Sequence, residues 1–156
     1  MSLEVNTYTP SDVILIFGGY RAEGWDRITI SRSVEAFRPV KGIRGKHTRI
    51  RDLDTSATIV LSVMQTSPTN DYLSGILEED FIQGTGRLEI TLKDSSGESR
   101  FSSVEAYITG FPETTYAEDI EYRSWNIFCQ TTDSYHLSGN EKPSNDLIRE
   151  ALRLFN

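Results

Sequence analysis

The sequence predicts an α+β fold that is mostly β: an antiparallel sheet of about six strands, rolled or folded into a small sandwich, with one flanking helix and a C-terminal helix. Several short segments alternate apolar and polar residues, which is the period of a half-buried strand. Clusters of Gly, Pro, Asn, Asp and Ser separate these segments. Two other segments repeat apolar residues at helical spacing, one in mid-chain and one at the end.

Length and composition place the chain among globular proteins. It has 156 residues, 37% hydrophobic and 25% charged, which fits one domain over residues 1–156 with a core of its own. Its single cysteine, Cys129, excludes an internal disulfide and lies in an apolar run, where a buried small hydrophobe is expected. We see no apolar run of the roughly 18 residues that a membrane helix needs, and no secretory signal in residues 1–9.

The first half of the chain is predicted to contain an extended arm and three strands. Residues 1–11 are polar and extended, and 13–17 form a short apolar strand. Residues 25–37 alternate along one long half-buried strand. Residues 58–65 form the next strand, whose two partly apolar faces indicate a sheet that is covered on both sides over part of its area.

A basic segment separates the second and third of these strands. Residues 38–51 contain no acid, and Pro39, Gly42 and Gly45 are expected to break any regular element there, which predicts a long loop. The rest of the chain has ten basic residues against 23 acidic ones, so charge is segregated along the sequence. The basic side chains of this loop are Arg38, Lys41, Arg44, Lys46, Arg49 and Arg51.

The second half is predicted to hold a helix, a hairpin, a last strand and a C-terminal helix. Pro68 stops the preceding strand, Thr69 or Asn70 caps the helix, and Gly84 ends it. The apolar positions of this helix are Tyr72, Leu73, Ile76, Leu77 and Phe81. Residues 87–93 and 100–109 form the hairpin, 113–121 an acidic loop, 120–130 the last strand and 143–156 the C-terminal helix.

No catalytic constellation is visible. The chain lacks the phosphate-loop, zinc-protease, nucleophile-elbow, paired-cysteine and calcium-loop patterns, so we expect no catalytic residue, cofactor or bound metal. The acidic runs at 78–80 and 118–121 lack metal-ligand spacing and are interpreted as solvated, electrostatic surface. His136, near Asp133 and Tyr135, has no partner nucleophile and is interpreted as a surface-loop residue. A net charge of −7 argues against a protein that grips nucleic-acid phosphates.

Two stretches fit one known order of elements: the run Gln65-Thr66-Ser67-Pro68-Thr69-Asn70-Asp71 at the end of a strand, and a later strand around Trp125-Asn126-Ile127. With this order of elements, the chain resembles the tail tube proteins of contractile phages and of phage-tail-like bacteriocins. The resemblance covers roughly residues 12–132. It implies two packed antiparallel β-sheets, in a sandwich-like barrel, with a flanking helix. It also implies a non-enzymatic virion protein that self-assembles into stacked hexameric rings, the inner tube through which DNA is ejected.

The resemblance carries expectations about partners. It implies assembly in the host cytoplasm into a phage tail, with sheath, baseplate and tape-measure proteins as further partners, DNA passing without specific binding and no membrane anchor. The alternatives are another ring-forming tail part (a tail terminator, baseplate hub or tube initiator) and a small β-rich binding module or unrecognised enzyme.

The same resemblance assigns two surfaces. It implies that the basic loop at 38–51 reaches a neighbouring subunit or ring, and that the strands at 25–37 and 58–65 line the lumen. Charge segregation adds that the loop docks on acidic surface of a neighbour. The acidic candidates are Glu78, Glu79, Asp80, Glu113, Glu118, Asp119 and Glu121. The lumen candidates are Arg27, Thr29, Ser31, Ser33, Glu35, Thr58 and Ser62, with Glu35 or Glu89 expected near Arg27 to offset its attraction for phosphate.

Overall fold

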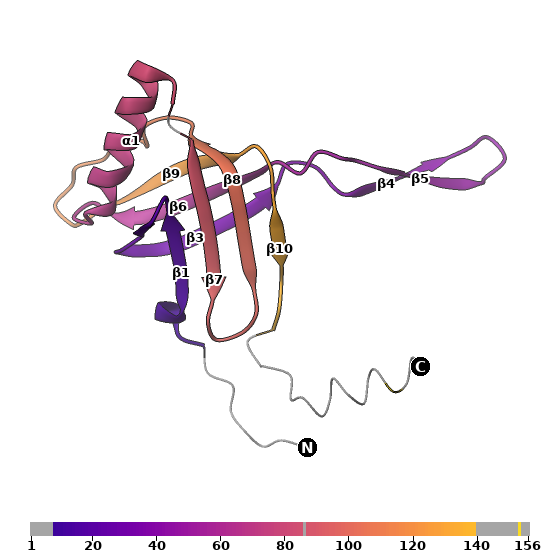
Figure 1. The fold of residues 1–156 in the computed structure, drawn as a ribbon, viewed down its shortest axis with the longest axis horizontal. Coiled ribbons are helices and arrows are strands. Elements are labelled where there is room, and N and C mark those ends of the chain that lie inside the picture. The colour runs from indigo at the N-terminus through magenta and orange to yellow at the C-terminus, as the bar shows by residue number, and fades with distance from the viewer. Residues whose placement is uncertain (1–7, 86, 140–152, 154–156) are drawn as a thin grey trace.

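The computed structural model describes residues 8–85, 87–139 and 153, and most of its regular structure is β (Figure 1). A 3₁₀ turn at Pro10–Asp12 leads into the sheet, and α1 spans Thr69–Gln83. The strands are β1 Val13–Phe17, β2 Tyr20–Arg21, β3 Trp25–Arg32, β4 Phe37–Lys41, β5 His47–Arg51, β6 Ala57–Met64, β7 Leu88–Asp94, β8 Arg100–Ile108, β9 Tyr122–Cys129 and β10 Ser134–His136. The predicted mostly-β, antiparallel α+β fold is confirmed.

Eight strands form one rolled antiparallel sheet. Their order is β2-β1-β7-β8-β9-β6-β3, and β10 pairs with β8. β1, β7, β8 and β10 form one layer, and β9, β6 and β3 cross behind it (Figure 1). The inward residues of both layers belong to one core, because strand alternation sends every second side chain to the inside. The fully buried ones include Leu15, Phe17, Ile59, Leu61, Val63, Ile90, Phe101, Trp125, Ile127 and Cys129.

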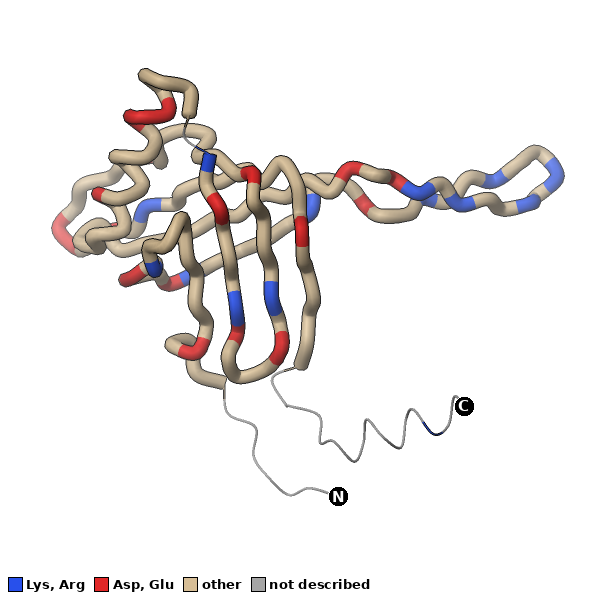
Figure 2. Tube along the Cα trace, viewed as in Figure 1, with Lys and Arg blue, Asp and Glu red and all other residues tan. Residues whose placement is uncertain are grey.

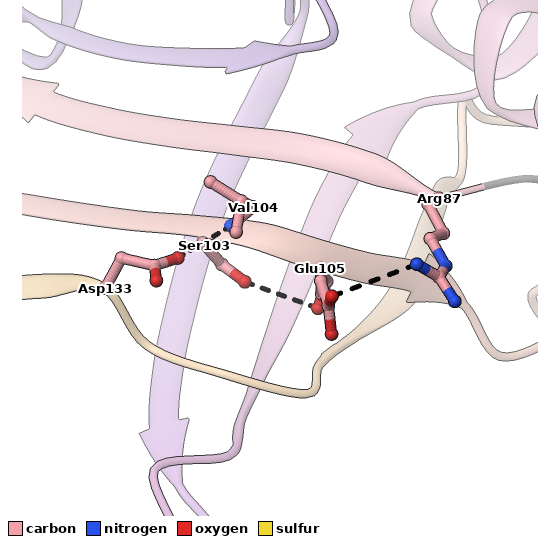
Figure 3. Close-up of polar contacts among 5 residues, drawn as sticks. All are labelled: Arg87, Ser103, Val104, Glu105 and Asp133. Carbon is pink, nitrogen blue, oxygen red and sulfur yellow. Dashed lines mark hydrogen bonds and ion pairs between the residues drawn. The ribbon is translucent and has the colours of Figure 1, made fainter.

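β8 contains a bulge and pairs with strands of both layers. The start of β8 pairs with β10, and its end pairs with β9. The bulge is where the register of β8 against β7 shifts, between Ser103 and Ala106. The carboxylate of Asp133 accepts a hydrogen bond from the backbone N–H of Val104 at 2.8 Å, next to the bulge (Figure 3). Arg87 reaches Glu105 on the same stretch at 3.8 Å, an exposed ion pair. A bulge bends and twists its strand, which helps the sheet to roll over itself.

Hydrogen bonds from buried and partly buried side chains join the start of α1 to both layers. The Asn70 amide donates to the carbonyl of Met64 at 2.9 Å, and its Oδ1 accepts from the Trp125 indole at 3.0 Å. Tyr72 donates to the carbonyl of Phe17 at 3.1 Å. The expectation that Thr69 or Asn70 caps the helix is wrong: both lie inside it, Pro68 is at the N-cap, and Ser67 Oγ accepts from the Thr69 N–H. The fixed φ of Pro68 suits the start of a helix, which leaves Asn70 for the sheet.

Several predicted boundaries need correction. The long strand at 25–37 ends at Arg32, and the chain then leaves the body toward β4. The strand at 120–130 is not the last, because β10 follows it. His136 lies in β10 rather than in a loop, since backbone pairing with Arg100 holds it there. The N-terminal arm at 1–11 and the helix at 143–156 fall largely outside the described residues, which include only 8–11 and Arg153 of them.

Candidate assembly surfaces

The basic segment is a hairpin that projects from the body. β4 and β5 pair from Phe37 opposite Arg51 to Lys41 opposite His47, and no other strand in the described part of the chain pairs with them (Figure 1). The expected loop without regular structure is therefore wrong. Pro39 is tolerated because both strands of a two-stranded sheet have an open edge. The glycines form the turn: Gly45 has φ +81°, and the Gly42 N–H donates to the Lys46 carbonyl at 2.8 Å.

Neither face of the hairpin packs on the body. Every residue of β4 and β5 is exposed, and the Arg49 guanidinium lies 4.2 Å from the centroid of the Phe37 ring. Ile43, in the turn, is fully exposed. An isolated two-stranded hairpin is marginally stable in water. The six basic residues all belong to this one projection (Figure 2).

The acidic candidates lie at the other end of the molecule. Glu78, Glu79 and Asp80 are in the last turns of α1, and the 113–121 segment carries the remaining four. Glu121 is fixed there, since its N–H donates to Gln65 Oε1 at 3.0 Å. α1 and the hairpin occupy opposite ends of the longest axis (Figures 1 and 2). Basic and acidic candidates therefore cannot meet within one subunit.

Most lumen candidates share one face of the rear layer. Arg27 is opposite Ser62 in the β3–β6 register, and Ser31 is opposite Thr58. Thr29 lies between them on β3 and faces the same way, while Ile28 and Ile30 turn toward the core. β9 extends this face with Ser124 and Asn126, which pair with Ser62 and Val60. Ser33 and Glu35 are exposed but lie beyond the end of β3, so the strand does not align them with the rest.

The neighbour of Arg27 differs from the expected one. Glu89 is on β7 in the front layer, and Glu35 lies past the end of β3. Asp26 instead occupies a bulge in β3, where the register to β6 shifts between Trp25 and Arg27. Asp26 and Arg27 both line a shallow groove on the rear layer with Thr29, Val60, Ser62 and Ser124. The local charge is therefore mixed at this point of the face.

Sequence reasoning missed an apolar groove beside α1. Phe81 was predicted to belong to the apolar stripe of the helix, but Phe81 and its neighbour Ile82 are 92% and 80% exposed. With Leu77 they form a groove of about 420 Å³ against Thr109, Gly110 and Phe111, and Glu78 lies at its rim. The sequence contained one signal of this groove: an apolar pair at the end of a helix that already has four other apolar positions to pack against the body. Phe81 does not continue that buried stripe.

Three features of the described residues bear on chemistry and on membrane contact. Cys129 is buried, as predicted. Burial raises the pKa of its thiol to about 11, although a hydrogen bond with Ser103 lowers this pKa to a smaller extent. Over residues 8–85 and 87–139, no three His, Cys, Asp or Glu side chains gather as a metal site. In the part that the structure describes, no helix has the length and apolarity to cross a bilayer.

Comparison with known proteins points to tail particles. No family model matches the chain. Structural protein ORF10 of Pseudomonas phage KPP10 is 28% identical over 155 residues, which cover 92% of this chain and 89% of the relative. A chain of the tail of an empty gene transfer agent particle with C6 symmetry aligns over 84% of this chain and 100% of its own, with a TM-score of 0.60 and 12% identity.

Two further solved structures belong to tube ends. A chain of the anti-feeding prophage cap, which terminates the tube, covers 87% of this chain and 97% of its own at a TM-score of 0.56 and 12% identity. A chain of the PVC sheath/tube terminator of an extracellular contractile injection system aligns over 84% of this chain and 97% of its own, with a TM-score of 0.52 and 14% identity. The predicted resemblance is confirmed: the chain has the fold of contractile-tail tube and terminator proteins and is similar in sequence to a structural protein of a phage.

Proposed function

We propose that this chain is a non-enzymatic structural subunit of a phage tail, which assembles into stacked rings around a central channel. The observation that carries the proposal is a projecting, fully exposed hairpin on a fold shared with chains of tail particles. A hairpin with no core under either face gains stability only by docking on another surface. Assembly with copies of the same chain supplies that surface.

Rings require contact between neighbouring sheets. β3 ends the strand path of the eight-stranded sheet, so one of its edges is open among the described residues. An open edge of eight residues is a template for pairing with another strand, and closing sheets from several subunits into one barrel removes such edges. Six subunits per ring is the number we propose, because a tail structure that contains a chain of the same fold has C6 symmetry.

The lumen wall in this proposal is the rear face that carries Arg27, Thr29 and Ser31 on β3, and Thr58 and Ser62 on β6. Hydroxyl groups make a wet wall, and the mixed charge of Arg27 with Asp26 provides no strong phosphate clamp. DNA then passes without being held. Its partners in the virion are the sheath, baseplate and tape-measure proteins of the same tail, and the chain reaches the virion by assembly in the host cytoplasm.

A terminator of the tube is the second candidate. Two of the compared structures are a tube-terminating cap and a sheath/tube terminator. A terminator shares the fold but stacks on one face only, so it forms rings that do not grow.

Negative-stain electron microscopy of the purified chain over a concentration series separates these functions. Long hollow rods are expected of the tube subunit, and isolated rings of the terminator. A protein that stays monomeric at every concentration contradicts both, and supports a small binding module instead. Sedimentation of the same samples measures how much protein has assembled.

A further inference from the structure

We propose that the apolar groove between α1 and the Thr109–Phe111 segment receives the tip of the β4–β5 hairpin from a second copy of this chain, with Ile43 as the inserted side chain. This inference rests on the proposed tube function and specifies the contact that stacks one ring on the next.

The groove has the composition of a docking site. Its apolar walls are Leu77, Phe81, Ile82 and Phe111, and the two α1 residues at its edge are almost fully exposed. The ring of Phe111 packs near the ring of the buried Trp125, with centroids 6.0 Å apart. A continuous apolar hollow with a polar rim is typical of a protein interaction site. The walls therefore offer a partly rigid receptor for one apolar side chain.

The charge around the groove calls for a cationic partner. Glu78, Glu79 and Asp80 lie in the last turns of α1, whose final turn, described throughout, contains no basic residue. The C-terminal end of a helix carries a partial negative charge, so the carboxylates of Glu78 and Glu79 near that end oppose the helix dipole. A docked cation relieves this unfavourable arrangement. The acidic 113–121 segment lies at the same end of the molecule (Figure 2).

The hairpin tip has the complementary properties. Ile43 is fully exposed at the turn, and Lys41, Arg44 and Lys46 surround it in the sequence. One apolar side chain with basic neighbours matches an apolar groove with an acidic rim. Burying one isoleucine changes an association constant by about tenfold or more, and several charge pairs at the rim add orientation.

The geometry makes the contact head-to-tail. Tip and groove lie at opposite ends of the longest axis, so a subunit cannot fill its own groove (Figure 1). Using two different patches of identical subunits gives a heterologous contact, which propagates instead of closing as a dimer. Each subunit donates one tip and accepts one, as growth of a stack requires.

Disulfide trapping in assembled full-length protein tests the pairing. The variant Ile43→Cys/Phe81→Cys is expected to form a ladder of cross-linked multimers on a non-reducing gel, because a disulfide forms only when the two Cβ atoms are about 3.5–4.5 Å apart. Leu53→Cys/Phe81→Cys is the matched control, since Leu53 is also well exposed but follows β5 at the base of the hairpin. Buried Cys129 is replaced by Ala in both variants.

A charge exchange provides a second readout that does not depend on cysteine. Arg44→Glu/Lys46→Glu and Glu78→Lys/Glu79→Lys are each expected to raise the concentration needed for assembly by about tenfold. The four changes combined restore assembly, because the charges are again opposite. Circular dichroism and thermal unfolding confirm that each variant is folded before assembly is measured.

The outcomes separate this inference from the proposed function. Rods that form normally while the tip and groove thiols fail to cross-link, or cross-link no better than the control pair, overturn the pairing and leave the tube function standing. Cross-links that stop at dimers overturn the head-to-tail contact. A wild-type chain that never assembles overturns both proposals.

Discussion

The indole N–H of Trp125 donates a hydrogen bond of 3.0 Å to Oδ1 of Asn70, and both residues are buried. This contact joins β9 in the rear layer to the start of α1. The Asn70 amide also donates to the carbonyls at the end of β6. The Asn70 side chain thus forms hydrogen bonds with the end of β6 and with the core tryptophan from its place at the start of α1. These bonds help to fix the position of α1 and of the groove beside it.

Replacing Asn70 should therefore destabilise the fold strongly. Asn70→Ala leaves the Trp125 N–H without its partner, and the expected loss is about 1–3 kcal/mol in the free energy of unfolding. Denaturant unfolding measures it, with Trp125→Phe and the double variant completing a cycle. A double variant as destabilised as the sum of the two single variants contradicts the coupling, because residues in direct contact are not additive.

Two glycines, Gly24 and Gly75, test the contact between the start of β3 and the residues just before α1. A Cβ at Gly24 would lie 2.9 Å from Cβ of Ser67, at a backbone φ of +64°. Gly24→Ala should cost about 1–3 kcal/mol of stability, since neither the conformation nor the space suits a side chain. Among the described residues, a Cβ at Gly75, inside α1, would meet no atom within 4 Å apart from the backbone of its own helix.

Gly75→Ala is the matched control and should stabilise the protein by up to about 1 kcal/mol through helix propensity. Thermal unfolding of the two variants against wild type gives the comparison. A Gly24→Ala protein as stable as wild type contradicts the described contact with Ser67.

Cys129 gives a prediction for alkaline pH. Because burial raises its pKa from 9.0 to about 11, the folded protein keeps the thiol proton where the unfolded chain loses it. The stability from this group is complete below pH 9 and is lost as the pH rises from about 9 to 11. Cys129→Ala should lose about 1 kcal/mol near pH 8, and the gap to wild type should shrink toward pH 11. Rapid labelling of the native thiol at pH 8 contradicts its burial.

The lumen surface is tested by adding charge on β3. Thr29→Lys should leave the fold and the tubes intact, because Thr29 is exposed on the rear face. A ring of added lysines should retain DNA, and the retention should weaken with salt. Thr91→Lys, exposed on β7 in the front layer, is the control and should not retain it. A Thr29→Lys chain that fails to fold shows that this position is buried and removes the lumen assignment.

Short-range patterns in the sequence were enough to predict two of the core strands. The strand at 100–109 was predicted almost to its ends, because buried apolar residues at every second position permit only one register. The strand at 13–17 was predicted from a short continuous apolar run. β2 has two residues and β10 three, which is too short for a period to be visible. Their pairing depends on neighbouring strands rather than on their own residues.

The hairpin and the groove were harder to predict for different reasons. Pro39, Gly42 and Gly45 argue against a strand when taken one by one, yet they fit an edge and a turn once β4 and β5 pair. Phe81 follows helical spacing, so its sequence position predicts burial. The helix projects past the sheet at that point (Figure 1), which leaves Phe81 exposed for reasons that only the tertiary arrangement reveals.

The most direct test of the tube function is a three-dimensional electron cryo-microscopy reconstruction of the assembled chain. We expect a hollow stack of sixfold rings, with the β3–β6 face toward the channel and each hairpin resting on a subunit of the next ring. Closed globular oligomers, or a tube whose channel is lined by the front layer of β1 and β7, would contradict the proposal.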